Sequence, residues 1–169
     1  MKILIHDLTA QEFGSLYPRL NEDITVIQND AEIHNCIGCF GCWIKTPASC
    51  IIKDSYKDMG KLISQSEELI IISRCYYGGY SPYVKNVLDR SISFVLPYFD
   101  IRNGEMHHKS RYSKKIKFSV CFYGENITND EKQTASEIVT ANSMNLNLKE
   151  SSVKFYRDYN DMKGEILWK

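Results

Sequence analysis

Short apolar runs recur along the chain, and polar segments of varying length separate them. Five of these runs are rich enough in β-branched and aromatic residues to predict strands. They are KILIHDL (2–8), ITVIQ (24–28), LIIIS (69–73), IKFSVCFYG (116–124) and SSVKFYRD (151–158). The run at 69–73 is the most apolar, which is typical of a strand buried on both faces of a parallel sheet.

Between the predicted strands, apolar residues recur at helical spacing. We expect helices near 56–63, from Pro82 to Val95, and at 128–146, the last opening with the capping-box spacing of Thr128 and Glu131. Strands that alternate with helices predict right-handed crossovers and a parallel sheet. The predicted fold class is therefore α/β: a flavodoxin-like three-layer sandwich with a five-stranded parallel sheet, in a single domain over 1–169.

In such a fold, ligands bind at the carboxyl ends of the strands. The informative loops are then 7–10, 29–54, 73–82 and 121–128. They hold all six cysteines, so we expect the cysteines to lie near one edge of the sheet.

Composition excludes several classes of protein. The 169 residues are enough to bury a core, and 21 basic and 21 acidic residues balance, which argues against a general nucleic-acid binder. No apolar run approaches the ~20 residues of a membrane span, and the start MKILIHDL lacks a signal-peptide pattern. We expect a cytoplasmic protein without membrane association, in which thiols stay reduced.

Four cysteines fall in NCIGCFGCWIKTPASC (35–50) with the spacing C-x2-C-x2-C-x7-C. They are Cys36, Cys39, Cys42 and Cys50. Short C-x2-C steps suit an iron–sulfur cluster, whereas zinc more often takes two separated C-x2-C pairs. Free thiols packed against Phe40 and Trp43 are the other interpretation. The spacing alone leaves metal binding and packed thiols open.

The stretches CIGCFGCWIKTPASCIIKD and LIIISRCYYGGYSPYVKNVLDR resemble the flavodoxin-like NAD(P)H-dependent FMN reductase family. Within it they are similar to the branch that includes the iron–sulfur flavoproteins. That branch typically has the cysteine stretch ending near an acidic residue, here Asp54, then a strand and a Y-x-G-x-x-S-x-x-x-K-x-x-x-D-R run. The residues of this run are Tyr76, Gly78, Ser81, Lys85, Asp89 and Arg90.

The resemblance implies an enzyme that binds FMN, takes electrons from NAD(P)H as co-substrate and passes them to a small-molecule acceptor. It also implies a homodimer or homotetramer and requires no catalytic acid or base. The implied flavin-binding residues are Cys75, Tyr76, Tyr77, Gly78, Tyr123, Gly124 and Glu125. Tyrosine faces and glycine backbone suit an isoalloxazine ring. The plainer interpretation of YYGGYSP is a turn into a helix capped by Ser81, with Pro82 at its first position.

The first loop departs from the family pattern. Asp7 stands where glycine is expected, and Thr9 and Glu12 have capping-box spacing, so this helix satisfies its own amides where the FMN phosphate would bind. For Arg74 we favour an ion pair with Asp7 over phosphate binding. The alternative function is accordingly a flavodoxin-like protein that has lost flavin and serves as a redox-sensing, metal-binding or interaction module.

Two further expectations concern the middle of the chain. The basic segment 97–115 is long for a connector, and we favour an exposed loop or dimer contact over a site for nicotinamide phosphates. The long final gap of the cysteine stretch, with bulky Trp43 and Ile44, leads us to expect no cluster and no bound metal. His6 and His34 belong to no motif.

Overall fold

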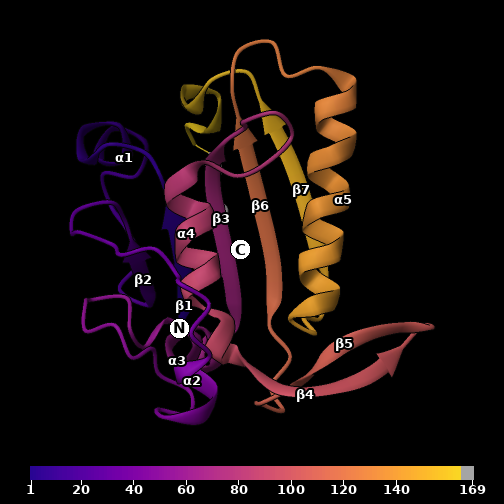
Figure 1. The fold of residues 1–169 in the computed structure, drawn as a ribbon. Coiled ribbons are helices and arrows are strands. Elements are labelled where there is room, and N and C mark those ends of the chain that lie inside the picture. The colour runs from indigo at the N-terminus through magenta and orange to yellow at the C-terminus, as the bar shows by residue number, and fades with distance from the viewer. Residues whose placement is uncertain (165–169) are drawn as a thin grey trace.

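The computed structural model describes residues 1–164 and contains the predicted five-stranded parallel sheet. The strand order is β2-β1-β3-β6-β7, which is the flavodoxin-like arrangement (Figure 1). The strands are β1 (Lys2–His6), β2 (Ile24–Ile27), β3 (Glu68–Arg74), β6 (Lys117–Tyr123) and β7 (Ser151–Tyr156). The predicted fold class is confirmed.

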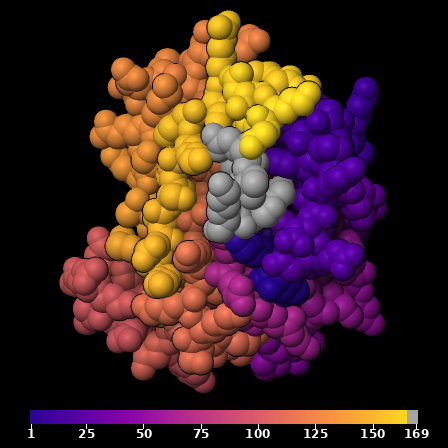
Figure 2. Space-filling model, turned by 180° about the vertical axis from the view of Figure 1, so that it is seen from behind, coloured from indigo at the N-terminus to yellow at the C-terminus, as the bar shows by residue number. Residues whose placement is uncertain are grey.

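Helices cover both faces of the sheet. They are α1 (Ala10–Leu16), α2 (Gly41–Ile44), α3 (Met59–Gln65), α4 (Pro82–Arg90), α5 (Asn129–Asn145) and the 3₁₀ turns η1 (Ile92–Phe94) and η2 (Tyr159–Met162). In Figure 1, α4 lies over β1 and next to β3, and α5 lies beside β7. From behind, N-terminal segments (indigo) and C-terminal segments (yellow) form much of the surface (Figure 2).

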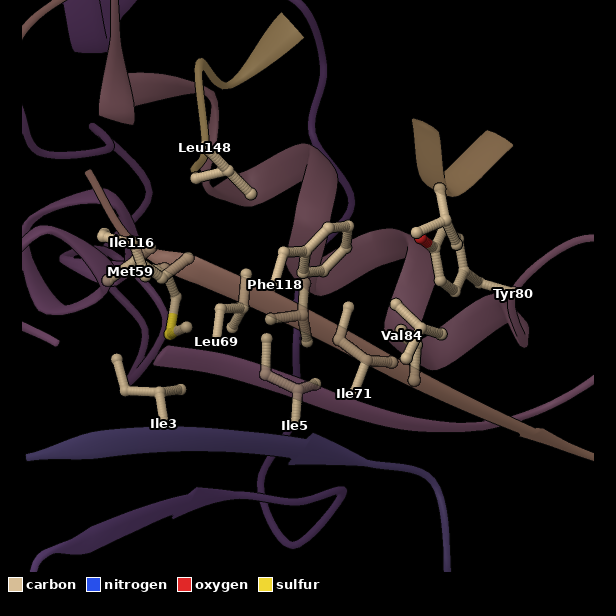
Figure 3. Close-up of a cluster of buried hydrophobic side chains, with 14 of the residues drawn as sticks. Ile3, Ile5, Met59, Leu69, Ile71, Tyr80, Val84, Ile116, Phe118 and Leu148 are labelled. Atoms are coloured by element: carbon tan, nitrogen blue, oxygen red, sulfur yellow. The ribbon is translucent and has the colours of Figure 1, made fainter. Parts of the chain in front are cut away.

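Alternate residues of each central strand enter two cores. Leu69 and Ile71 of β3 pack with Val84 of α4 on one face, in the cluster drawn in Figure 3. Ile70 and Ile72 pack on the reverse face with residues of α1 and η2. All four are fully buried, which accounts for the apolar run at 69–73.

The segment after α4 differs from its prediction. The helix ends at Arg90 instead of continuing to Val95, and an antiparallel hairpin follows, β4 (Val95–Arg102) and β5 (Glu105–Ser110). The expectation of a loop at 97–115 is therefore wrong for most of that segment, and a dimer contact there stays a prediction. Asn103 and Gly104 have φ of 54° and 83°, as a two-residue hairpin turn requires, and this Asn-Gly pair was the signal in the sequence. The hairpin projects from one end of the sandwich (Figure 1).

No helix within residues 1–164 is both long and apolar enough to cross a membrane.

Candidate functional site

The loop after β3 forms a tight turn at the carboxyl edge of the sheet. The Cys75 amide donates to the Tyr123 carbonyl at 2.8 Å, and Tyr76 and Gly79 exchange backbone hydrogen bonds of 2.9 and 2.7 Å. Tyr77 and Gly78 occupy the turn with φ of 51° and 79°. Tyr77 is thus a non-glycine residue in the left-handed region, and the residue is 91% exposed. The loop presents Tyr76 and Tyr77 to solvent where ligands bind in this fold.

Gly78 has a structural reason besides its backbone angle. A Cβ at this position would lie 2.7 Å from Cβ of Thr134 and 2.9 Å from the Glu131 carbonyl oxygen, both on α5. The turn therefore rests directly on α5. Although Gly78 lies in a loop, a larger side chain there must displace the helix.

The plainer interpretation of Ser81 and Pro82 is confirmed. The Ser81 hydroxyl accepts from the Val84 amide at 3.4 Å, and Pro82 occupies the first turn of α4. The Ser81 amide also donates to the Ser73 hydroxyl at 2.8 Å. Helix capping explains these two residues but not the exposed tyrosines before them.

Asp7 organises the neighbouring strand ends. Its carboxylate accepts from the Arg74 backbone amide at 2.9 Å and from the Tyr123 hydroxyl at 3.0 Å. Burial raises the pKa of Asp7, while hydrogen bonds from Ser81, Arg74 and Tyr123 oppose that rise. The expected ion pair between Arg74 and Asp7 is therefore wrong, because the backbone amide of Arg74 contacts the carboxylate and its guanidinium does not. The Arg74 guanidinium lies 5.9 Å from the centroid of the Tyr76 ring.

The start of α1 is self-capped, as predicted. The Thr9 amide donates to the Glu12 carboxylate at 2.7 Å, and the Glu12 amide donates to the Thr9 hydroxyl at 3.2 Å. A phosphate at this helix start would meet amides that already have partners and the carboxylates of Asp7 and Glu12. The residues present here do not fit an FMN phosphate.

The remaining predicted flavin residues lie at the same edge, with other contacts. The hydroxyl of Tyr123 is held by Asp7, and the Gly124 amide donates to the Tyr156 carbonyl at 3.1 Å. Burial, together with the Asp7 carboxylate, raises the pKa of Tyr123. Glu125 follows in the loop before α5. The structure thus brings the loops after β3 and β6 together, as predicted.

A buried ion pair fixes both ends of the cysteine segment. The guanidinium of Arg90, which is fully buried, donates to both carboxylate oxygens of Asp54 at 2.7 Å each and to the His34 carbonyl at 2.7 Å. The His34 amide also donates to Asp54 at 3.2 Å. Burial opposes ionisation of Asp54, but the hydrogen bonds from Arg90 and the His34 and Tyr56 amides lower its pKa to about 2. The sequence singled out Asp54 and Arg90 as motif members but did not reveal that they pair.

The four clustered cysteines line one cavity of about 660 Å³ between their own segment, α4 and α5. Most of the remaining lining is apolar, and we call this cavity the cysteine groove. Its apolar walls include Trp43, Leu88, Ile92, Ile138 and Leu146. Burial raises the pKa of the Cys42 thiol, and the neighbouring thiols act in the same direction. Across residues 1–164, no three Cys, His, Asp or Glu side chains lie close enough together to hold a metal ion.

The expectation that all six cysteines share one edge is wrong. Cys75 lies in the turn at the carboxyl edge, and Cys121 points from β6 into the reverse core. The clustered cysteines lie toward the other end of the sheet. The reason is that α4 begins near the carboxyl edge and runs toward the amino end of the sheet. Its last residue, Arg90, therefore anchors the cysteine segment at the amino end. The Trp43 indole, which donates to the Val95 carbonyl at 2.9 Å, fixes α2 at that end (Figure 1).

Comparison with known proteins gives one sequence relative and several structures of similar fold. No established family profile matches the chain. An iron–sulfur flavoprotein of Methanocaldococcus jannaschii is 36% identical over 74 residues, which are 44% of this chain and 37% of that protein. The matched region is thus well under half of that relative's length.

Solved structures show the fold more broadly. An FMN-dependent NADH-azoreductase from Bacillus anthracis, in complex with FMN, superposes with a TM-score of 0.54 at 8% identity, covering 91% of this chain and 85% of that chain. General stress protein 14 from Treponema denticola, in complex with FMN, gives 0.52 at 12% identity, covering 92% and 85%. The resemblance to flavodoxin-like FMN reductases is confirmed in the fold, and the M. jannaschii match supports the iron–sulfur flavoprotein branch.

Proposed function

We propose that the protein is a flavin oxidoreductase that takes electrons from a nicotinamide cofactor and delivers them to a small acceptor. The observation that carries this proposal is the turn after β3. There Tyr77 keeps an unfavourable left-handed backbone and an almost fully exposed ring at the ligand-binding edge. Backbone strain of this kind persists where the surrounding structure enforces it, often at binding sites. A bound flavin accepts a hydride and passes on electrons.

The protein's own part in this proposal is to bind and orient the ring. Tyr76 and Tyr77 supply aromatic faces, and the contact of Gly78 with α5 holds the turn in place. The Arg74 guanidinium, 5.9 Å from the centroid of the Tyr76 ring, would supply positive charge beside a flavin held by this turn. Because the start of α1 does not fit a phosphate, the affinity resides in the ring contacts.

The experiment is the absorption spectrum of the purified protein, followed by anaerobic addition of NADH or NADPH. We expect flavin bands, with flavin supplied if necessary, that bleach when the nicotinamide is added. Tyr77→Ala should weaken flavin binding by about 2- to 12-fold, since an aromatic contact contributes about 0.5–1.5 kcal/mol. Tyr98→Ala removes an exposed tyrosine from the hairpin instead and serves as the matched control. If wild type and Tyr77→Ala bind flavin equally, the turn after β3 no longer supports the proposed function.

A second candidate function rests on two other observations. The self-capped first loop and the four thiols around one cavity favour a flavin-free redox or metal-binding module. Flavin content, measured together with iron and acid-labile sulfide after anaerobic purification, separates the two candidates. Our proposal expects flavin and no cluster. About four irons per chain would instead make Cys36, Cys39, Cys42 and Cys50 the ligands.

A cytoplasmic location remains part of the proposal, and so does a homo-oligomer. Neither depends on which electron acceptor the protein uses.

A further inference from the structure

The cysteine groove has the size of a small-molecule site. Its volume of about 660 Å³ lies within the range of about 300–1,000 Å³ that is usual for such sites. Because an apolar cavity of about 150 Å³ already accommodates a benzene ring, the groove has room for a molecule of two or three fused rings. Tyr76 and Tyr77, which we propose to contact the flavin, do not line this cavity. The groove is therefore space that the proposed flavin contacts leave unused.

Aromatic rings and thiols form one wall of the groove. Phe40 and Trp43 both line it, and their rings stack at 5.4 Å between centroids. The Trp43 indole is fixed by its hydrogen bond to the Val95 carbonyl, whereas Phe40 is more than half exposed. Burial raises the pKa of the Cys42 thiol, so this thiol is neutral and adds a soft, polarisable surface beside the rings. Such a wall suits a planar, aromatic ligand.

Two side-chain amides of α5 supply the polar groups on the opposite wall. Asn142 and Asn145 line the groove, and residues three apart on a helix lie on the same face. Nδ2 of Asn142 donates to the Tyr80 hydroxyl at 3.3 Å, and Oδ1 of Asn145 lies 2.9 Å from Nδ1 of His107. Within residues 1–164 the structure gives no partner to the other end of either amide, which is the acceptor Oδ1 of Asn142 and the donor Nδ2 of Asn145.

The charges around the groove are already neutralised. Lys85 pairs with Asp89 at 2.6 Å, and Arg90 pairs with Asp54 at 2.7 Å. Neither cation lacks a counterion, so the lining offers no unpaired charge to an anionic ligand. The groove therefore suits a neutral molecule.

We propose that the cysteine groove binds a small, neutral, planar molecule with a lactam edge, in which a ring N–H stands next to a ring C=O. The lactam N–H donates to Oδ1 of Asn142, and its carbonyl accepts from Nδ2 of Asn145. The ring system lies against Phe40 and Trp43. This inference does not depend on flavin binding.

The test uses carbostyril and coumarin, two planar bicyclic probes of nearly the same shape. Carbostyril has the lactam edge, and coumarin has a ring oxygen in place of the N–H. Isothermal titration calorimetry on the full chain should show that wild type binds carbostyril roughly 5-fold more tightly than coumarin, as expected for one hydrogen bond. No binding of carbostyril at millimolar concentration, or equal binding of the two probes, overturns the inference.

Variants of Asn142 test which residue reads the lactam. Asn142→Leu removes the acceptor at similar volume, so the preference for carbostyril should disappear. Asn142→Asp keeps an oxygen and should keep the preference. Asn129→Leu makes the same substitution at an exposed position in the first turn of α5 and should change neither dissociation constant. A preference that persists in Asn142→Leu overturns the assignment, and circular dichroism verifies that each variant is folded.

Phe40→Ala tests the aromatic wall and decides even if Asn142→Leu does not fold. Phe40 is exposed, so the fold should tolerate its loss. The variant should bind both probes about 2- to 12-fold more weakly while it retains the preference for carbostyril. Unchanged binding of both probes would place them outside the groove and overturn the inference.

A titration in the presence of saturating FMN separates this site from the flavin site. The dissociation constant of carbostyril should not change on addition of FMN, nor in Tyr77→Ala. Competition between FMN and carbostyril would mean that the flavin ring occupies the groove, which overturns a separate site. A protein that binds carbostyril but no flavin would support this inference and contradict the proposed function, so the two failures are distinguishable.

Discussion

The carboxyl edge of the sheet and the cysteine groove are both rich in aromatic residues, yet they differ in how their polar groups are used. At the edge, Asp7 accepts from the Arg74 amide and the Tyr123 hydroxyl, and Thr9 and Glu12 cap each other's backbone amides. In the groove, the polar contacts lie at the ends of the cysteine segment, where Arg90 and Asp54 pair, and the cavity between them is largely apolar. The comparison teaches that a chain can match a family's motifs in one region and depart from them in another: the first loop, which departs from the pattern, closes the anion site, while an apolar cavity stands open beside the matching cysteine stretch.

The largest expected effect comes from breaking the anchor of the groove. Arg90→Met should lower the free energy of unfolding by about 3–5 kcal/mol, because it leaves the Asp54 carboxylate buried without its partner. Lys85→Met is the control on the same helix. It removes an exposed i,i+4 pair with Asp89 and should cost at most about 0.5 kcal/mol. Denaturant unfolding measures both, and equal losses would contradict the role given to Arg90.

The turn at the edge allows a second matched pair. Gly78→Ala combines a positive φ with a contact of 2.7 Å to Thr134 and should destabilise by about 2–3 kcal/mol. Gly104→Ala has the same kind of φ, with no atom within 4 Å of the new Cβ, and should cost about 1 kcal/mol. Thermal and denaturant unfolding give the difference, which isolates the contact with α5. A Gly104→Ala loss as large as that of Gly78→Ala would show that the contact does not matter.

As the pH falls, the carboxyl edge should lose stability at a higher pH than the anchor of the cysteine groove does. Burial lowers the pKa of His6 to about 4, from 6.5 when unfolded, so His6 stabilises the fold above pH 6.5 and that stability is lost as the pH falls toward 4. Between pH 7 and pH 5 the loss should be about 2 kcal/mol. The stabilisation from Asp54 is present above pH 3.8 and is lost only as the pH falls toward 2. His6→Phe, which keeps a ring against Phe13, should flatten the loss between pH 7 and pH 5. If the free energy of unfolding of His6→Phe depends on pH as that of wild type does, a group other than His6 causes the acid sensitivity.

The smallest expected effect tests the closed first loop. Thr9→Ala should cost about 1 kcal/mol of stability through loss of the cap, and Thr128→Ala, in the equivalent capping box of α5, should cost a similar amount. Neither should change flavin affinity. A large loss of flavin affinity in Thr9→Ala alone would instead identify Thr9 as a phosphate ligand.

Local patterns were enough to predict the sheet and most of its helices, but not α2 or the end of α4. The apolar run at 69–73 and the capping pairs at Thr9 and Thr128 each specify their structure within a few residues of sequence. The hairpin was missed because the helical spacing that ends in Val95 outweighed the Asn-Gly signal at 103–104.

The arrangement of the candidate sites was harder to predict. Arg90 and Asp54 are separated by a strand and a helix, and only packing shows that they meet. The position of the cysteine segment depends on that contact, so its place away from the carboxyl edge could not be read from cysteine spacing. Likewise, the contact of Gly78 with Thr134 depends on where α5 lies, which no local pattern records.

The central claim is that the turn after β3 binds the flavin ring without help from α1. The most direct test titrates the purified protein with FMN and with riboflavin in parallel. If the ring provides the affinity, the two dissociation constants should agree within about threefold. A phosphate held by charge-assisted hydrogen bonds adds about 1.5–3 kcal/mol per bond, which is roughly 10- to 100-fold in affinity. FMN binding tighter than riboflavin by that factor would contradict the closed phosphate site, and binding of neither flavin would contradict the proposed function itself.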